Sequence, residues 1–353
     1  SKEYKVRGII RRARSPNTQR FEHLIKKYGL TDDIHAPFIV KYGDLTDAGN
    51  IREIIERYKP DEIYNLGAQS HVGISFENPH ATIHINALGA LNILEALRQM
   101  KSKCKYYQAS SSEMFGVSPP PQNELTVMQP QSPYGIAKLA AYHLTRVYRR
   151  AYGLFACNGI LFNHESERRG HNFVTKKITQ ELAKIVVGEV DKIVLGNLDA
   201  MRDWGYSAEY VQAMWLILQH HEPDDFVVAT EETHTVRDFV RETFTLIGLD
   251  YEKFLVTSER YQRPADVPAL LGDASKARRI LGWKPKVKFK ELVVMMTEAD
   301  LKKKFEEAGI LPIEPALERP RSYYISKARD YVKTLRFPPE YYLASVPQIP
   351  SGF

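Results

Sequence analysis

Short β-rich runs alternate with longer amphipathic runs through the first half of the chain, and this alternation restricts the fold more than any other feature. The β-rich runs cover residues 6–10, 38–40, 62–66, 105–109 and 156–162. Amphipathic runs over residues 48–58, 81–100 and 133–152 separate them. Successive parallel strands need crossover helices of this kind. The pattern therefore predicts an α/β protein with an open, doubly wound parallel sheet.

Beyond about residue 165 the alternation becomes looser. Helical patterns over residues 172–187, 208–220 and 236–247 alternate with short β-rich runs at residues 193–195 and 226–229. We expect a first domain over residues 1–165 and a smaller α/β domain over residues 166–310.

The last part of the chain has a different composition. Seven of the 20 prolines follow Ile310, together with the paired tyrosines Tyr323-Tyr324 and Tyr341-Tyr342. This composition predicts an extended tail over residues 311–353 that lies on another surface. A disordered appendage has much the same composition, although the aromatic content argues against full disorder.

Composition and charge exclude several classes of protein. No apolar run approaches the roughly 20 residues that span a bilayer, so no membrane span is expected. Cys104 and Cys157 stand alone, so we expect no disulfide framework, no metal site and a reducing, cytoplasmic compartment. The net charge of +6 favours an anionic small substrate. Nucleic acid is not expected, because the basic residues are dispersed and are not interleaved with aromatics.

Four residues in two neighbouring segments suggest acid/base chemistry. Ser111 and Glu113 come just past the β-rich run at 105–109, and ligands of doubly wound sheets bind beyond the carboxyl ends of the strands. Tyr134 and Lys138 are four residues apart and share a helix face, where an ammonium can stabilise a phenolate. A surface pair on an amphipathic helix has the same spacing, but the upstream Ser-Ser-Glu favours the acid/base interpretation.

These segments resemble the GDP-mannose 4,6-dehydratase family of extended short-chain dehydrogenases/reductases over roughly residues 4–305. The most specific motifs are Asn163-His164-Glu165-Ser166, Arg168-Arg169-Gly170, Leu195-Gly196-Asn197-Leu198-Asp199-Ala200 and Arg202-Asp203-Trp204-Gly205. The resemblance implies a Rossmann-type NADP-binding domain followed by a sugar-nucleotide-binding domain. It also implies a homo-oligomer, either a dimer or a tetramer.

The resemblance further implies the reaction. NADP would oxidise C4 of GDP-mannose, with Tyr134 as the base for the 4-hydroxyl and Lys138 keeping that tyrosine ionisable. Glu113 would remove the C5 proton as water leaves C6. Ser111, where the family often has Thr, would hydrogen-bond the keto oxygen or the leaving group. The hydride would return to C6 to give GDP-4-keto-6-deoxymannose.

Cofactor preference can also be argued from the residues. Arg11 and Arg12 follow a predicted strand, where a guanidinium suits the 2′-phosphate of NADP. An ordinary basic loop is the alternative. The resemblance adds candidate contacts to adenine (Asp44, Leu45), to the pyrophosphate and nicotinamide (Leu66, Ala68, Gln69), to a cofactor amide (His164) and to a neighbouring subunit's cofactor (Asn17, Thr18). His164 could instead be a core histidine.

Substrate contacts are implied by the resemblance alone. The positions that match the surroundings of GDP are Asn163, Val174, Lys177, Gly196, Arg202 and Arg263. Arginine side chains suit a diphosphate because they bind it through two hydrogen bonds. Asp266 stands where the family usually has Glu, which gives a shorter reach toward guanine.

One expected element is missing from the 353 residues. A dinucleotide fold needs glycines in its first strand-to-helix turn, but no G-x-G or G-x-x-G occurs here. Two interpretations follow. In the first, a segment precedes Ser1 and the protein is an enzyme. In the second, the loss is real and the chain is an inactive subunit of a larger assembly, attached through residues 311–353. The presence of Glu113 and Tyr134 favours the enzyme. So does the expected instability of a truncated chain, because loss of a central strand leaves backbone donors and acceptors on both neighbouring strands without partners.

Overall fold

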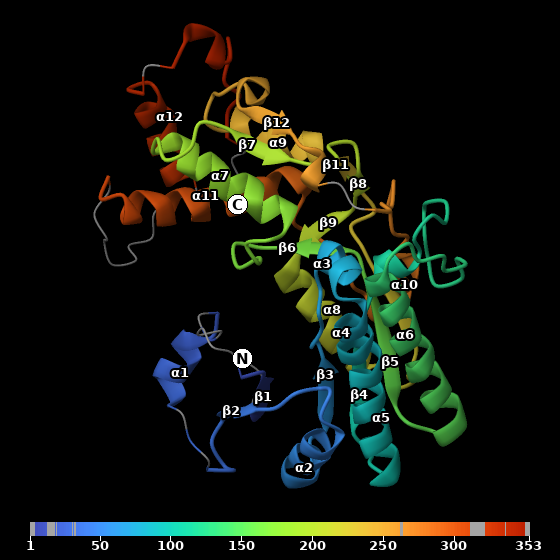
Figure 1. Cartoon of the computed structure of the whole chain (residues 1–353). Helices are drawn as coiled ribbons and strands as arrows, with labels where there is room; N and C mark the ends of the chain where they lie inside the picture. The colour runs from blue at the N-terminus through green and yellow to red at the C-terminus, as the bar shows by residue number, and fades with distance from the viewer. Residues whose placement is uncertain are drawn as a thin grey trace. The chain divides into compact units, whose positions relative to one another are not determined.

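The computed structural model describes residues 4–12, 18, 20–29, 31, 33–261, 264–310, 322–335 and 337–349 (Figure 1). Asn17 and Arg263 lie outside the described residues. The chain forms two compact units. The first comprises residues 1–114, 132–159 and 217–225, and the second comprises residues 115–131, 160–216 and 226–353.

The first unit carries the strands and crossover helices that the sequence predicts. Its strands are β1 (Val6–Ile10), β2 (Phe38–Tyr42), β3 (Glu62–Asn65), β4 (Lys105–Ser111) and most of β5 (Ala156–Leu161). Its helices are α1 (Glu22–Tyr28), α2 (Ala48–Tyr58), α3 (Val72–Glu77), α4 (Pro79–Ile83), α5 (Gly89–Gln99) and α6 (Pro133–Tyr152). The α/β fold with parallel strands is therefore confirmed.

The sheet consists of two pieces. Strands β1 and β2 form a parallel pair, and a separate sheet has the order β10-β5-β4-β3, with β3 parallel to β4. Strand β10 covers Asp225–Val228. Among the described strands, β1 pairs only with β2 and β3 pairs only with β4. Among the described residues, these strands therefore lie in two separate sheets.

Helix α6 begins and ends where its sequence dictates. The Ser132 hydroxyl accepts a hydrogen bond from the Gly135 backbone N–H (3.0 Å), and Pro133 occupies the first helical turn. The helix ends before Gly153, whose φ of 66° suits glycine. This cap fixes the first turn of α6, and Tyr134 lies in that turn.

The single helix predicted for residues 81–100 is interrupted. Helix α4 runs into a π-helical turn, η1 (His84–Leu88), before α5 begins. The hydrophobic pattern did not reveal the turn, because apolar residues continue through it on both sides. Such turns often occur at functional sites.

The second unit contains short paired strands and packed helices. Its strands are β6 (Asn163–Glu165), β7 (Ile193–Leu195), β8 (Met201–Arg202), β9 (Trp204–Tyr206), β11 (His234–Thr235), β12 (Leu255–Thr257) and most of β10. Its helices are α7 (Val174–Val186), most of α8 (Ser207–Gln219), α9 (Val236–Thr245), α10 (Ser275–Leu281), α11 (Phe289–Glu307) and α12 (Tyr323–Val332). Strands β6 and β9 pair in parallel, as do β7 and β12.

Helix α11 contributes many buried residues to this unit's core. It packs against α7 and α9, and also against α12 (Figure 1). Because neighbours cover several of its faces, its apolar residues are not confined to one stripe. The sequence analysis did not predict this helix for that reason.

The prediction of an extended tail is wrong for residues 323–332. These residues form α12, and Tyr324, Ile325, Ala328 and Val332 join the core of the second unit. Their spacing puts them on one helix face. The prolines that suggested an extended segment flank this helix rather than interrupt it. No helix within the described part of the chain is both long and apolar enough to span a membrane.

Candidate active site

Ser111 and Glu113 occupy the carboxyl end of strand β4. Ser111 is the last residue of the strand, and Glu113 lies in the 3₁₀ turn η2 (Ser112–Met114) that follows. The Ser111 hydroxyl accepts a hydrogen bond from the Glu113 backbone N–H at 3.2 Å. Both side chains are only 8% exposed. A hydroxyl and a carboxyl group therefore lie together at the edge of the sheet where ligands of this fold bind.

Tyr134 and Lys138 lie on α6, which packs against β4 and η2. The Lys138 ammonium donates a hydrogen bond to the Ala109 carbonyl oxygen in β4 (2.7 Å) and lies 5.9 Å from the centre of the Tyr134 ring. Both residues are buried, which excludes the surface-pair interpretation. Burial lowers the pKa of Lys138 to about 8. The lysine is thus held in place by β4 and can stabilise a negative charge on the tyrosine.

The ends of β1 and β2 bring a cation and a carboxylate close together. Ile10 is the register partner of Tyr42, so Arg11 and Asp44 follow neighbouring strand ends. The Thr46 backbone N–H is the main reason that the pKa of Asp44 is lowered, and Arg11 lowers it further. Arg11 and Arg12 are exposed. This edge can therefore receive an anionic group.

The loop after β3 carries the other predicted cofactor residues of this unit. The Leu66 side chain is 54% exposed, and Ala68 is half-buried. Asn86 holds the Gln69 backbone by two hydrogen bonds: its Oδ1 accepts from the Gln69 N–H (2.8 Å), and its Nδ2 donates to the Gln69 carbonyl (2.9 Å). The Gln69 Oε1 atom is buried and has no hydrogen-bond partner among the described residues. It is thus available to a ligand that carries a donor.

The sequence analysis did not identify Asn86. This residue lies in the π-helical turn η1 and is only 2% exposed. The available signal was an amide side chain between apolar residues of the run 81–100, since a buried polar side chain needs partners.

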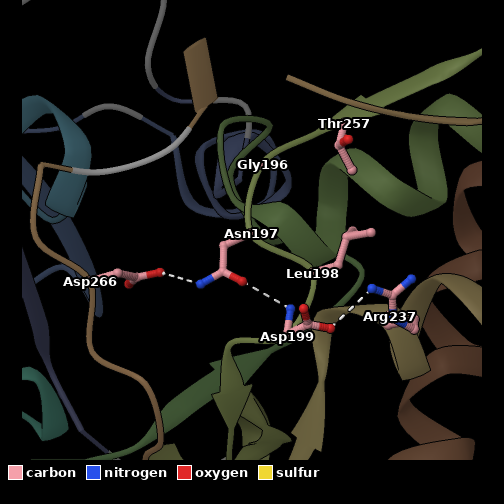
Figure 2. Close-up of a pocket in the computed structure, with 7 residues that line it drawn as sticks. All are labelled: Gly196, Asn197, Leu198, Asp199, Arg237, Thr257 and Asp266. Carbon is pink, nitrogen blue, oxygen red and sulfur yellow. Dashed lines mark hydrogen bonds and ion pairs between the residues drawn. The ribbon is translucent and has the colours of Figure 1, made fainter. Parts of the chain in front are cut away.

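The second unit contains a pocket of about 370 Å³ (Figure 2). The residues that line it are Gly196, Asn197, Leu198, Asp199, Arg237, Thr257 and Asp266. Asn197 donates to Asp266 (3.1 Å) and accepts from the Asp199 backbone N–H (3.0 Å). Arg237 donates to Asp199 at 3.0 Å. A chain of hydrogen bonds thus fixes the polar groups around the pocket, as the dashed lines of Figure 2 show.

Arg202 extends this chain of hydrogen bonds through Asp266. Its guanidinium is 7% exposed and donates to Asp266 (3.1 Å) and to the carbonyl oxygens of Met201 (2.9 Å) and Val267 (2.8 Å). Asp266 therefore already has two partners, Arg202 and Asn197. The sequence analysis did not single out Asp199, Arg237 or Thr257; only Asp199 carried a signal, because it stands in the motif that begins at Leu195.

The other predicted residues of this unit occupy separate elements. Lys177 on α7 donates to the Val194 carbonyl in β7 at 2.7 Å, and Val174 begins α7. Asn163 and His164 lie in β6. His164 Nδ1 is bonded to the Phe162 carbonyl at 2.9 Å, and its ring stacks on Tyr210 with centres 5.1 Å apart. The ring of His164 is therefore held on two sides.

Comparison with known proteins identifies the family. Residues 1–296 match the sequence model described as GDP-mannose 4,6 dehydratase. The chain belongs to this family. It is 54% identical over 305 residues to GDP-mannose 4,6 dehydratase 2 of Arabidopsis thaliana, covering 85% of this chain and 81% of the relative. It is 48% identical over 320 residues to GDP-mannose 4,6 dehydratase of Homo sapiens, covering 85% and 86%.

A solved structure supports the fold of this dehydratase family member. It is RMD from Pseudomonas aeruginosa complexed with NADPH, with a TM-score of 0.69 and 22% identity, covering 80% of this chain and 95% of that one. At this identity the likeness shows the Rossmann-type fold alone. Nothing in these comparisons favours the alternative of an inactive subunit.

The residues of the first unit fit the cofactor of a dehydratase of this family. Arg11 and Arg12 provide cations for a phosphate at the strand ends. The unpaired Gln69 Oε1 can accept a hydrogen bond from a ribose hydroxyl or an amide. These two features match the phosphate and the donor groups of NADP.

Proposed function

We propose that the protein converts GDP-mannose to GDP-4-keto-6-deoxymannose and water, with NADP as its cofactor. The observation that carries the proposal is the match of residues 1–296 to the dehydratase family. The buried Tyr134 and Lys138 beside β4 agree with it, because the reaction begins with the loss of a proton from an alcohol.

Tyr134 carries out the first proton transfer, from the 4-hydroxyl of the sugar. NADP, when bound, supplies the chemistry of accepting a hydride from C4 and returning it at C6. Tyr134 takes the proton of the 4-hydroxyl, and Lys138 stabilises the phenolate that does so. The bond from Lys138 to Ala109 keeps the ammonium on the side of α6 that faces β4.

The second proton transfer falls to Glu113. A ketone at C4 acidifies the proton at C5, and the Glu113 carboxylate removes it while the C6 hydroxyl takes up a proton and leaves as water, which gives a C5–C6 double bond. Once the hydride has returned to C6, a proton returns to C5, so the two protons taken by Tyr134 and Glu113 are both given back. Ser111 hydrogen-bonds the keto oxygen or the leaving hydroxyl as negative charge develops there. The bond between the Ser111 hydroxyl and the Glu113 backbone orients both groups at one strand end.

The GDP moiety binds in the pocket of the second unit. Arg202 supplies positive charge for the diphosphate, with Lys177 and Arg263 as further contacts. The carboxylates of Asp199 and Asp266 can accept hydrogen bonds from the ring N–H and amino group of guanine. Gly196 lines the pocket and leaves it room. Asn163 and Val174 complete the predicted set of GDP contacts, and His164 contacts an amide of the cofactor.

The protein acts as a homo-oligomer, a dimer or a tetramer, in the cytoplasm. The buried free thiols of Cys104 and Cys157 suit a reducing compartment. Sedimentation of the purified protein tests the oligomeric state, and a monomer at micromolar concentration contradicts it.

The test of the function is turnover by the purified full-length protein. With NADP and GDP-mannose we expect a 4-keto sugar nucleotide, detected by its absorbance in alkali, and no product from UDP-glucose under the same conditions. A folded protein that binds no NADP and forms no product contradicts the proposal and favours the inactive subunit.

A further inference from the structure

We call residues 322–335 and 337–349 the C-terminal segment. This segment contacts the loop that joins two walls of the pocket. We call residues 246–254, between α9 and β12, the connector. Arg237 near the start of α9 and Thr257 at the end of β12 both line the pocket. The connector therefore joins these two walls of the pocket.

Hydrogen bonds join the C-terminal segment to the connector at three points. Arg329 on α12 donates through Nε to the Leu246 carbonyl at 2.6 Å. The Asp250 backbone N–H donates to the Tyr341 carbonyl at 2.9 Å, and the Leu343 N–H donates to the Gly248 carbonyl at 3.0 Å. Gly248 has a φ of 81°, and Val346 fills the space where a side chain would stand. The backbone of the connector is thus held along much of its length.

Aromatic packing adds a fourth contact. Phe254, the last residue of the connector, is 1% exposed. Its ring meets Phe337 at 5.3 Å and 83° and Tyr341 at 5.0 Å and 88°, both edge-to-face. The Phe254 carbonyl accepts from the Ile193 N–H at 2.8 Å, where β12 begins to pair with β7. A shift of Phe254 would therefore reach both strands beside the pocket.

The C-terminal segment is itself anchored in this unit. The Glu298 carboxylate on α11 accepts from the backbone N–H groups of Tyr324 (2.7 Å) and Ile325 (2.8 Å) in the first turn of α12. Arg329 Nη2 donates to the Pro347 carbonyl at 2.8 Å, so one guanidinium joins α12, the connector and the end of the chain. The segment lies beyond residue 296, where the family match ends.

We infer that Arg329 and Tyr341 are positioning residues: they fix the connector and so hold Arg237 and Thr257 at the separation that the nucleotide requires. The inference rests on the proposed function only in naming GDP as the ligand. Without the contacts of Arg329 and Tyr341, the connector samples other conformations. The apparent affinity for GDP then falls in proportion to the fraction of molecules whose pocket has the conformation that binds GDP. Neither side chain is required to touch the ligand.

The test uses two pairs of matched variants in the full-length protein. Arg329→Met removes the bonds to Leu246 and Pro347 but keeps the aliphatic stem, and Lys327→Met changes an exposed residue of the same helix. Tyr341→Ala removes the ring from Phe254, and Tyr341→Phe keeps it. We measure the Kd for GDP by calorimetry, KM and kcat for GDP-mannose, and hydrogen exchange of the connector amides.

For Arg329→Met and Tyr341→Ala we expect a roughly fivefold rise in the Kd for GDP and in KM, with kcat unchanged. Exchange should accelerate at residues 246–257 and not elsewhere in the unit. Lys327→Met and Tyr341→Phe should match the wild type.

Wild-type affinity and exchange in folded Arg329→Met and Tyr341→Ala overturn the inference. So does faster exchange spread evenly over the unit, since that reports general destabilisation. If the wild type binds no GDP, the proposed function fails, and the exchange measurement still decides whether the segment holds the connector. If Arg329→Met does not fold, the two Tyr341 variants decide.

Discussion

The Lys138 ammonium lies 2.7 Å from the carbonyl oxygen of Ala109, so a lysine near the ring of Tyr134 also joins helix α6 to strand β4. This bond lies between two segments that the sequence separates by a long loop. It places the tyrosine and the end of β4, with Ser111, in one rigid piece of the first unit. The Lys138 ammonium and the Ser111 hydroxyl are therefore both held by hydrogen bonds to the backbone.

Because Lys138 is buried, we expect kcat to fall at basic pH. Burial lowers its pKa to about 8, and a lysine is charged below its pKa and neutral above it. As the pH rises through about 8, the ammonium that stabilises the Tyr134 phenolate is lost, so kcat should fall. A pH profile of kcat checks this. Lys138→Met should lower kcat by about 100-fold or more at neutral pH.

The same shift predicts how stability depends on pH. The folded-state pKa lies below the ordinary value of 10.5, so the unfolded chain binds more protons between pH 8 and 10.5. The contribution of Lys138 to the free energy of unfolding therefore rises with pH across this window. In denaturant titrations at a series of pH values, the free energy of unfolding of Lys138→Met should lack this rise. If the free energies of the two proteins changed with pH in the same way, the lowered pKa of Lys138 would be contradicted.

Glu113→Gln should abolish dehydration while sparing the fold. The amide keeps the size of the side chain but cannot accept the C5 proton, so kcat should fall by about 100-fold to 10,000-fold. The 4-keto product measures kcat, and circular dichroism measures the fold. Glu53→Gln, on an exposed position of α2, is the matched control and should keep full activity. Near wild-type turnover by Glu113→Gln would assign the base elsewhere.

Asn86→Ala should destabilise the first unit and weaken cofactor binding. The change leaves the half-buried Gln69 N–H and carbonyl without the Asn86 side chain as a partner, which costs about 2 kcal/mol in the free energy of unfolding. NADP titration should show a higher Kd, because the loop after β3 is no longer fixed. Asn92→Ala, which removes one bond to the Leu45 carbonyl, should cost less. An equal loss of stability and of NADP affinity in both variants would contradict the role of Asn86 in fixing the loop after β3.

Local patterns explain how far the sequence predicted the fold. The β-rich runs and crossover helices of the first unit follow from hydrophobic periodicity, so strands such as β4 were predicted almost to their ends. Helices α11 and α12 could not be predicted in this way. Neighbours cover several faces of α11, so it lacks the one-sided pattern of a surface helix. Helix α12 has one apolar face, but the prolines on both sides of it indicated an extended segment.

The residues of the candidate site also fall into two groups, those that local spacing predicts and those that only tertiary structure brings together. Tyr134 and Lys138 are near in sequence, so their shared helix face could be predicted. Asn86 and Gln69 meet only because the π-helical turn follows the loop after β3, and Arg237 meets Asp199 only because α9 packs beside the loop after β7. Such contacts depend on tertiary structure, which a single sequence without a repeat or motif does not reveal.

Arg202→Met should weaken GDP binding through the diphosphate. The guanidinium is buried against Asp266 at the edge of the pocket and supplies the positive charge proposed for the phosphates. We expect the Kd for GDP to rise by about tenfold or more, because hydrogen bonds between charged groups are the strong ones. Guanosine, which has no phosphate, should lose much less affinity, so the two Kd values should converge in calorimetry. Arg241→Met, on the exposed side of α9, should leave both unchanged. If GDP and guanosine weakened equally in Arg202→Met, the arginine would hold the pocket in shape and would not bind phosphate.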